Sequence, residues 1–218
     1  MNSYKKNVIY ICFCLFVIYA GAVRPVLNHR SHMTNQPLTT NPGKRQPAKK
    51  RPVDATEQFM RTPIDWRKSS ETKPYPDLAK VKDLNVLVSI RKNRTYLRDG
   101  QHVIYTMYSS AGQYHRQGKR GKNVSYTPVG TFYIQQARGM NFFNQRLNEG
   151  ANYYVSWLNN GEYLFHSVPT KADGSYDRQE ARKLGKSTGS HGCVRLSVSD
   201  ARWMMEHLPV GTKVTIEN

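Results

Sequence analysis

Residues 190–195 combine side chains that can carry out nucleophilic chemistry. They spell Ser-His-Gly-Cys-Val-Arg. If this segment is extended, His191, Cys193 and Arg195 lie on one face of the chain. Two potentially cationic neighbours favour the thiolate form of a cysteine, which is its nucleophilic form. Gly192 allows another backbone to approach closely and can leave amide N–H groups facing a developing oxyanion. The segment therefore predicts a nucleophilic cysteine.

A second histidine, His166, has a position suited to a general base. It ends the apolar stretch Tyr163-Leu164-Phe165 and precedes Ser167. A histidine at the end of a strand can hold its ring beside a thiol on a neighbouring strand. We expect ordinary structural roles for the histidines in tail, hairpin, loop and helix positions: His29, His32, His102, His115 and His207.

No metal or cofactor is predicted. One cysteine and two histidines could ligate zinc, but zinc would quench the nucleophile.

The elements that must position these residues are mostly strands. Alternating apolar residues, turn dipeptides and β-branched runs predict strands at 86–90, 96–98, 101–105, 131–134, 153–157, 163–166 and 212–216. Asp99-Gly100 predicts a hairpin turn. Two helices are expected. One spans 176–184, and the other runs to Leu208 after a capping box at Ser197 and Asp200. The fold class is mostly β, a two-sheet sandwich or barrel with one or two short helices.

The first 23 residues predict export from the cytoplasm. Lys5 and Lys6 precede an apolar run at 8–23, and Ala20-Gly21-Ala22 has the small-x-small form of a cleavage site. The run is intermediate in length between a signal core and a membrane span, so a cleaved signal peptide and a retained signal-anchor both remain open. The protein is then extracytoplasmic, either anchored or secreted to the cell wall. In that setting Cys193 is the one thiol outside the apolar run and has no intramolecular disulfide partner.

The formal net charge of +18 is concentrated near the amino terminus. Residues 1–53 hold nine Lys and Arg and no acidic residue. Residues 24–53 contain five Pro and few large apolar side chains, which predicts a disordered basic stalk. Outside the cell its partners would be anionic wall polymers or lipid head groups rather than nucleic acid, and a merely solvated tether is the alternative. Residues 54–80 are expected to form an irregular lead-in to the domain.

Residues 81–218 resemble the YkuD-type L,D-transpeptidase catalytic domain, a family of cell-wall cysteine enzymes. The motif has an upstream histidine, Phe165-His166-Ser167, and then Ser190-His191-Gly192-Cys193-Val194-Arg195. Thr127-Pro128-Val129-Gly130 resembles the strand entry of the family, and Gly211-Thr212-Lys213-Val214 also fits.

Roles for individual residues follow from this resemblance. It implies that Cys193 is the nucleophile and His166 the base, with the backbone at Ser167 orienting the imidazole. Ser190, His191 and Gly192 would support the oxyanion, and Arg195 would bind a substrate carboxylate or steady the loop. The 23-residue spacer between His166 and Ser190 is expected to form a lid or a substrate wall.

The resemblance also implies an activity. An L,D-transpeptidase forms 3→3 cross-links through a cysteine thioester on peptidoglycan tetrapeptide stems and releases D-alanine. Carbapenem-type β-lactams are the implied inhibitors. The residues alone leave three alternatives: an L,D-carboxypeptidase using the same site, a sortase-type cysteine transpeptidase, and a non-catalytic wall-binding protein.

Overall fold

The computed structural model describes residues 57–118 and 121–218, which belong to one compact unit. The signal or anchor segment at 1–23, the stalk at 24–53 and the start of the lead-in lie outside the described residues. Within them, no helix has both the length and the apolar character needed to cross a bilayer.

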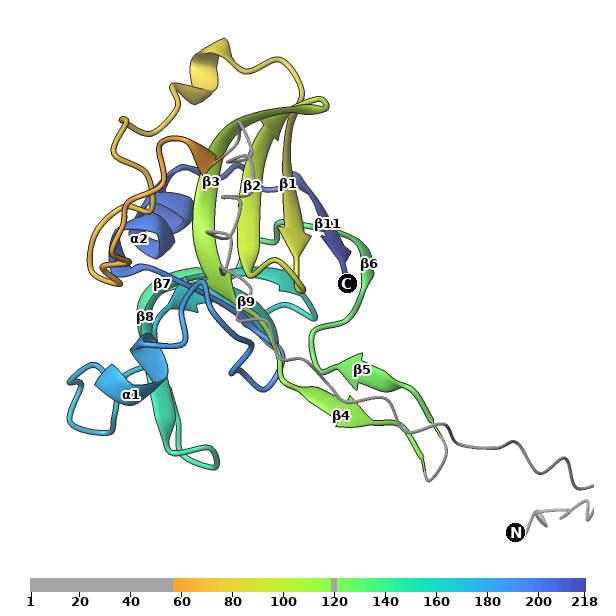
Figure 1. Ribbon diagram of the computed structural model, residues 1–218, viewed down its shortest axis with the longest axis vertical. Coiled ribbons are helices and arrows are strands. Elements are labelled where there is room, and N and C mark those ends of the chain that lie inside the picture. Colours follow the sequence, from red (N-terminus) through yellow and green to blue (C-terminus); the bar gives the residue numbers. More distant parts are fainter. Residues whose placement is uncertain (1–56, 119–120) are drawn as a thin grey trace, which may run out of the picture. The chain divides into compact units, whose positions relative to one another are not determined.

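A nine-stranded sheet forms the framework, with the strand order β6-β11-β1-β2-β3-β10-β9-β8-β7 (Figure 1). Its strands are β1 (Leu84–Ser89), β2 (Arg94–Asp99), β3 (His102–Ser110), β6 (Gly130–Tyr133), β7 (Arg138–Asn144), β8 (Glu149–Leu158), β9 (Tyr163–Ser167), β10 (Val194–Leu196) and β11 (Lys213–Glu217). A separate hairpin consists of β4 (Tyr114–Arg116) and β5 (Asn123–Ser125).

The sheet curls until its two halves meet. Directly after β6, the chain bonds to β8, with Gln135 N donating to Ser156 O at 2.8 Å. Phe132 of β6 packs against Trp157 of β8 with ring centroids 5.0 Å apart. Both halves contribute side chains to one buried apolar core. The mostly β, barrel-like prediction is therefore confirmed, although hydrogen bonding joins the strands into one curled sheet rather than two separate ones.

The hairpin between β2 and β3 forms where the sequence predicts it, but its turn is shifted by one residue. Asp99 pairs with His102, so Gly100 and Gln101 make the two-residue turn. Gly100 has φ 57°, the left-handed conformation that a tight hairpin turn requires. A β-bulge at Leu97 and Arg98 lies next to this turn.

Both predicted helices exist, at unequal length. α2 (Val198–His207) starts at Ser197, whose hydroxyl accepts a hydrogen bond from Asp200 N at 3.1 Å. The predicted box is only half formed, because the Asp200 carboxylate instead accepts hydrogen bonds from Ser70 and Tyr75. The apolar face of α2 packs on β8, β9 and β10. α1 (Arg178–Ala181) is one turn long, and the rest of the predicted stretch forms irregular turns.

The described part of the lead-in docks on β3. It contains an isolated bridge between Met60 and Glu71 and a 3₁₀ helix, η2 (Leu78–Lys80). Glu71 Oε1 accepts a hydrogen bond from Thr106 N at 2.7 Å, and Ser70 Oγ accepts one from Tyr108 N at 2.8 Å. Backbone donors of β3 are thus satisfied by lead-in side chains, which fix this segment to the domain.

Candidate active site

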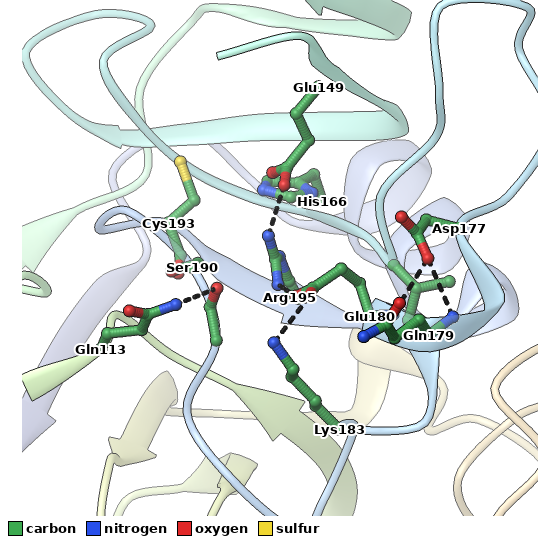
Figure 2. Close-up of polar contacts among 12 residues, drawn as sticks. Gln113, Glu149, His166, Asp177, Gln179, Glu180, Lys183, Ser190, Cys193 and Arg195 are labelled. Carbon is green, nitrogen blue, oxygen red and sulfur yellow. Dashed lines mark hydrogen bonds and ion pairs between the residues drawn. The ribbon is translucent and has the colours of Figure 1, made fainter.

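Parallel pairing of β9 with β10 brings the two candidate catalytic residues together. The register aligns Phe165 with Val194 and His166 with Arg195. Cys193 immediately precedes β10, and His166 lies on the adjoining strand β9, so both side chains come from this strand pair (Figure 2). The two residues are 27 positions apart in sequence and become neighbours only through this strand pairing.

The segment before β10 is bent, not extended. Residues 191–193 form a bend, and regular strand begins at Val194. Gly192 has φ 143°, and a Cβ there would lie 2.8 Å from Cε1 of Tyr163, so the position requires glycine. The expectation that His191, Cys193 and Arg195 share one face is therefore wrong, since His191 is exposed whereas Arg195 is buried.

Two hydroxyl groups hold this bend in place. Ser190 Oγ donates to the carbonyl of Cys193 and accepts a hydrogen bond from Gly192 N at 3.1 Å. Thr127 Oγ1 donates to the carbonyl of Gly192 at 2.7 Å. The Gly192 amide therefore faces the Ser190 hydroxyl. The Thr-Pro-Val-Gly segment noted in the sequence supplies the second hydroxyl.

The Cys193 thiol is half-buried at the end of β9. Leu164 N–H donates to Sγ at 3.3 Å, and Sγ lies 3.6 Å from the carbonyl of Glu162. Burial raises the pKa of Cys193 to about 11, although the Leu164 amide and the Arg195 charge act in the opposite direction. The expectation of a thiolate favoured by two cationic neighbours is therefore wrong, because Arg195 is the one cation that lowers this pKa and desolvation outweighs it.

His166 is a neutral, oriented imidazole. Its exposed fraction is 2%, and its Nδ1 lies 2.6 Å from the carbonyl of Ser167. A carbonyl accepts only, so Nδ1 carries the proton and Nε2 is the basic nitrogen. Burial, followed by the charge of Arg195, lowers the pKa of His166 to about 3. The Ser167 backbone thus orients the ring. Among the described residues, no hydrogen bond joins this ring to Cys193 Sγ.

Arg195 is buried inside the protein between two carboxylates. Its exposed fraction is 2%, and its guanidinium bonds to Glu149 at 2.6 Å and to Glu180 at 2.7 Å. Glu180 also pairs with Lys183 at 2.6 Å (Figure 2). The expectation that Arg195 binds a substrate carboxylate is therefore wrong, because both terminal nitrogens of its guanidinium already bond to Glu149 and Glu180. Its contacts instead link the strand after Cys193 to β8 and α1.

A cavity of about 680 Å³ opens onto the cysteine and the histidine. One side, which we call the catalytic wall, consists of residues from β9 and the bend: Leu164, His166, Ser190, His191, Gly192 and Cys193. A second group of lining residues, which we call the hairpin wall, comes from the β7–β8 hairpin: Phe142, Asn144, Arg146, Leu147 and Glu149. Phe142 joins the two walls through an edge-on contact with His166, with ring centroids 5.5 Å apart.

Sequence reasoning missed the hairpin wall. Its residues follow no strict alternation, and only the cluster of polar and aromatic residues at 141–146 signals a binding surface. The spacer between His166 and Ser190, expected to be a lid or a wall, lines a neighbouring cavity of about 240 Å³. Ser167 does not line the larger cavity, since its role is internal. Across the described residues, no cluster of His, Cys, Asp and Glu is placed to hold a metal ion.

The sequence of the chain matches a known protein family. The model of the YkuD L,D-transpeptidase catalytic domain matches residues 84–216. The chain is 43% identical over 164 residues to the putative L,D-transpeptidase YciB of Bacillus subtilis, covering 75% of this chain and 80% of that protein.

Solved structures are more distant. A complex of the L,D-transpeptidase LdtMt1 with imipenem is 20% identical, with a TM-score of 0.46, and the match covers 62% of this chain and 59% of that one. An L,D-transpeptidase from Mycobacterium smegmatis is 19% identical with the same TM-score and the same coverage. This chain thus spans about three fifths of each of these solved chains. The family model and the Bacillus relative show that this chain belongs to the L,D-transpeptidase catalytic-domain family.

Proposed function

We propose that the protein is a peptidoglycan L,D-transpeptidase that uses Cys193 as its nucleophile and His166 as its general base. One observation carries the proposal: a thiol and an imidazole with an unprotonated Nε2 line the same cavity. Family membership supports the same reaction class. The substrate would be a tetrapeptide stem with a diamino acid at position three and D-alanine at position four.

The first step is acylation of the cysteine. The thiol proton passes to Nε2 of His166 as Sγ attacks the carbonyl of the third residue, and a carbon–sulfur bond forms. The bond from that carbonyl carbon to the nitrogen of D-alanine breaks. His166 returns the proton to this nitrogen, and D-alanine leaves. The products of this step are a thioester on Cys193 and a neutral His166.

The second step transfers the acyl group. The side-chain amine of a neighbouring stem attacks the thioester carbonyl, and the carbon–sulfur bond breaks. His166 takes a proton from the attacking nitrogen and gives it to the sulfur. The result is a 3→3 cross-link and a restored thiol. With water as the acceptor, the same steps describe an L,D-carboxypeptidase.

Neutral reactants suit this sequence of steps. A Cys193 pKa raised to about 11 and a His166 pKa lowered to about 3 keep both groups uncharged at neutral pH. The proton therefore moves only as the sulfur attacks. The thiol must first turn from the Glu162 carbonyl toward His166, a reorientation compatible with the looser geometry of substrate-free sites. The Leu164 amide remains beside the sulfur as it leaves in the second step.

Two parts of the proposal concern the location of the domain and rest on segments outside the described residues. The apolar run at 8–23 would place the domain outside the cytoplasm, as an anchored or secreted protein. The basic stalk at 24–53 would then hold the domain near anionic wall polymers.

Incubation with muropeptide tetrapeptides tests the proposal. The full chain should release D-alanine, and mass spectrometry should show a cross-linked dimer, or a tripeptide if water is the acceptor. Cys193→Ala is the matched control and should leave the substrate unchanged. Intact substrate with the wild-type protein, or equal turnover by both proteins, would overturn the proposal.

β-Lactams give a second readout of the same thiol. Complexes of related L,D-transpeptidases with imipenem and with a faropenem-derived adduct exist. A carbapenem should add one mass adduct to this chain and none to Cys193→Ala. An active enzyme that forms no adduct would contradict a β-lactam-accepting cavity.

A further inference from the structure

We infer that Arg146 binds a carboxylate of the donor stem, so that the enzyme prefers stems with free carboxylates over stems in which they are amidated. This inference rests on the proposed function and names the substrate class that the site selects. Arg146 would then fill the role that the sequence suggested for Arg195, whose guanidinium is already bound.

Arg146 lies beside the candidate active site. It is exposed in the turn between β7 and β8 and lines the cavity that contains Cys193 and His166. It is the one Lys or Arg among the described residues of the cavity lining. A guanidinium presents a flat fork of donors that matches a carboxylate in a bidentate pair.

The protein itself supplies no counter-ion for Arg146. Within the described residues, no ion pair involves it. The sequence from 100 to 148 has no acidic residue at all. Two carboxylates line the cavity, and each has a partner: Glu149 pairs with Arg195, and Glu162 accepts a hydrogen bond from Asn159 at 2.7 Å. A negative group brought by the substrate would complete this charge arrangement.

The turn that carries Arg146 is fixed at its base. Leu147 N donates to Asn144 Oδ1 at 3.2 Å, which closes the turn. The ion pair of Glu149 with Arg195 and the paired backbone hydrogen bonds between Gly150 and Thr170 anchor the strand that follows. The side chain of Arg146 is therefore free to move while its backbone remains held beside the cavity. A long arginine side chain on a fixed backbone can reach a carboxylate that is bound in the cavity.

Several carboxylates of a stem could be the partner. A tetrapeptide stem has one on its acidic second residue and one on the terminal D-alanine, and diaminopimelate at position three adds another. The chemistry is the same for all three, and donors amidated at one position at a time distinguish them.

The experiment measures kcat/KM for D-alanine release from the free donor and from each mono-amidated donor. For the wild-type protein, amidation at the contacted position should lower kcat/KM about tenfold, as expected for loss of one charge-assisted pair. Arg146→Ala should show that loss already with the free donor and no further loss with the amidated one. Its loss should lie in KM, with an unchanged pH profile. Arg146→Lys should recover part of the rate.

Arg116→Ala is the matched control, because it removes an exposed arginine that does not line the cavity. It should leave kcat/KM for every donor within about twofold of the wild type, as for a surface charge with no fixed partner. If Arg146→Ala loses rate equally on free and amidated donors, or loses none, the inference is wrong. If the wild-type protein turns over no donor at all, the proposed function itself fails, which is a different outcome.

Discussion

The two walls of the cavity differ in burial and in charge. The catalytic wall pairs a half-buried thiol with a buried imidazole, and burial keeps both neutral. The hairpin wall presents the exposed cation Arg146 and half-buried side chains such as Phe142 and Asn144. Desolvation suppresses charge where a proton must be transferred, whereas exposure preserves charge where a substrate is recognised. Under the proposed function, the same cavity would separate chemistry from selection by the depth at which its groups lie.

Arg195 is the exception that connects the two walls. It is a buried cation two residues after Cys193, yet its bond to Glu149 reaches the base of the hairpin wall. Its charge also lowers the pKa of His166. Glu180 is the second carboxylate of this cluster. It pairs with both Arg195 and Lys183, so two carboxylates face two cations. Arg195 thus links β10 to the first residue of β8 and lowers the basicity of the imidazole.

The largest expected effect comes from removing the sulfur from the catalytic wall. Cys193→Ala should abolish D-alanine release, with a loss of about 10⁴-fold or more, because no other thiol lines this wall among the described residues. Circular dichroism should show an unchanged fold, since the site is only half-buried. Residual turnover above about 1% would place the nucleophile elsewhere.

Removal of the base should have a smaller effect. His166→Ala is expected to lower kcat by about 10²- to 10⁴-fold, the contribution of a positioned general base. His191→Ala serves as the comparison, because His191 also lines the cavity but is exposed. A larger loss for His191→Ala than for His166→Ala would transfer the role of base to His191.

The link between the walls can be tested through stability. Arg195→Met leaves Glu149 and Glu180 without their shared cation, and removing one partner of a buried ion pair costs about 3 kcal/mol. The two carboxylates keep some access to water, so we expect the loss of stability to be no larger than about 3 kcal/mol. The acid limb of the activity profile should also move to higher pH, because the pKa of His166 rises when the neighbouring cation is absent.

Arg202→Met is the control and should give the smallest effect. Arg202 forms an exposed pair with Glu206 at 2.8 Å, and exposed pairs of this kind contribute little to stability. Urea unfolding of both variants gives the comparison. Equal stability of Arg195→Met and Arg202→Met would show that Arg195 does not hold the two walls together.

Local patterns in the sequence predicted most of the fold. Alternating residues located β1, Ser197 located the start of α2, and Asp99-Gly100 located the β2–β3 hairpin. The shift of that hairpin turn by one residue and the half-formed capping box at Asp200 were not predictable. Both depend on partners far away in sequence, such as Ser70, which lies 130 positions before Asp200.

The sequence indicated two residues that share a cavity, but not their electrostatics. The motif around Cys193 and the upstream His166 predicted a nucleophile and a base, and both side chains line the same cavity. A linear sequence does not show that residues 191–193 bend, nor that Arg195 turns inward toward two carboxylates. Desolvation depends on the assembled core, so the sequence suggested a thiolate where burial favours the thiol.

The pH dependence of Cys193 alkylation tests the neutrality of the catalytic wall most directly. Iodoacetamide reacts with the thiolate, so the rate should rise about tenfold per pH unit from pH 7 to pH 10, toward the pKa of about 11. Intact-mass measurement follows Cys193, the one thiol among the described residues, and Cys193→Ala is the blank that accounts for Cys12 and Cys14. A rate that is already constant between pH 5 and pH 8 would show a thiolate paired with an imidazolium and would contradict the account.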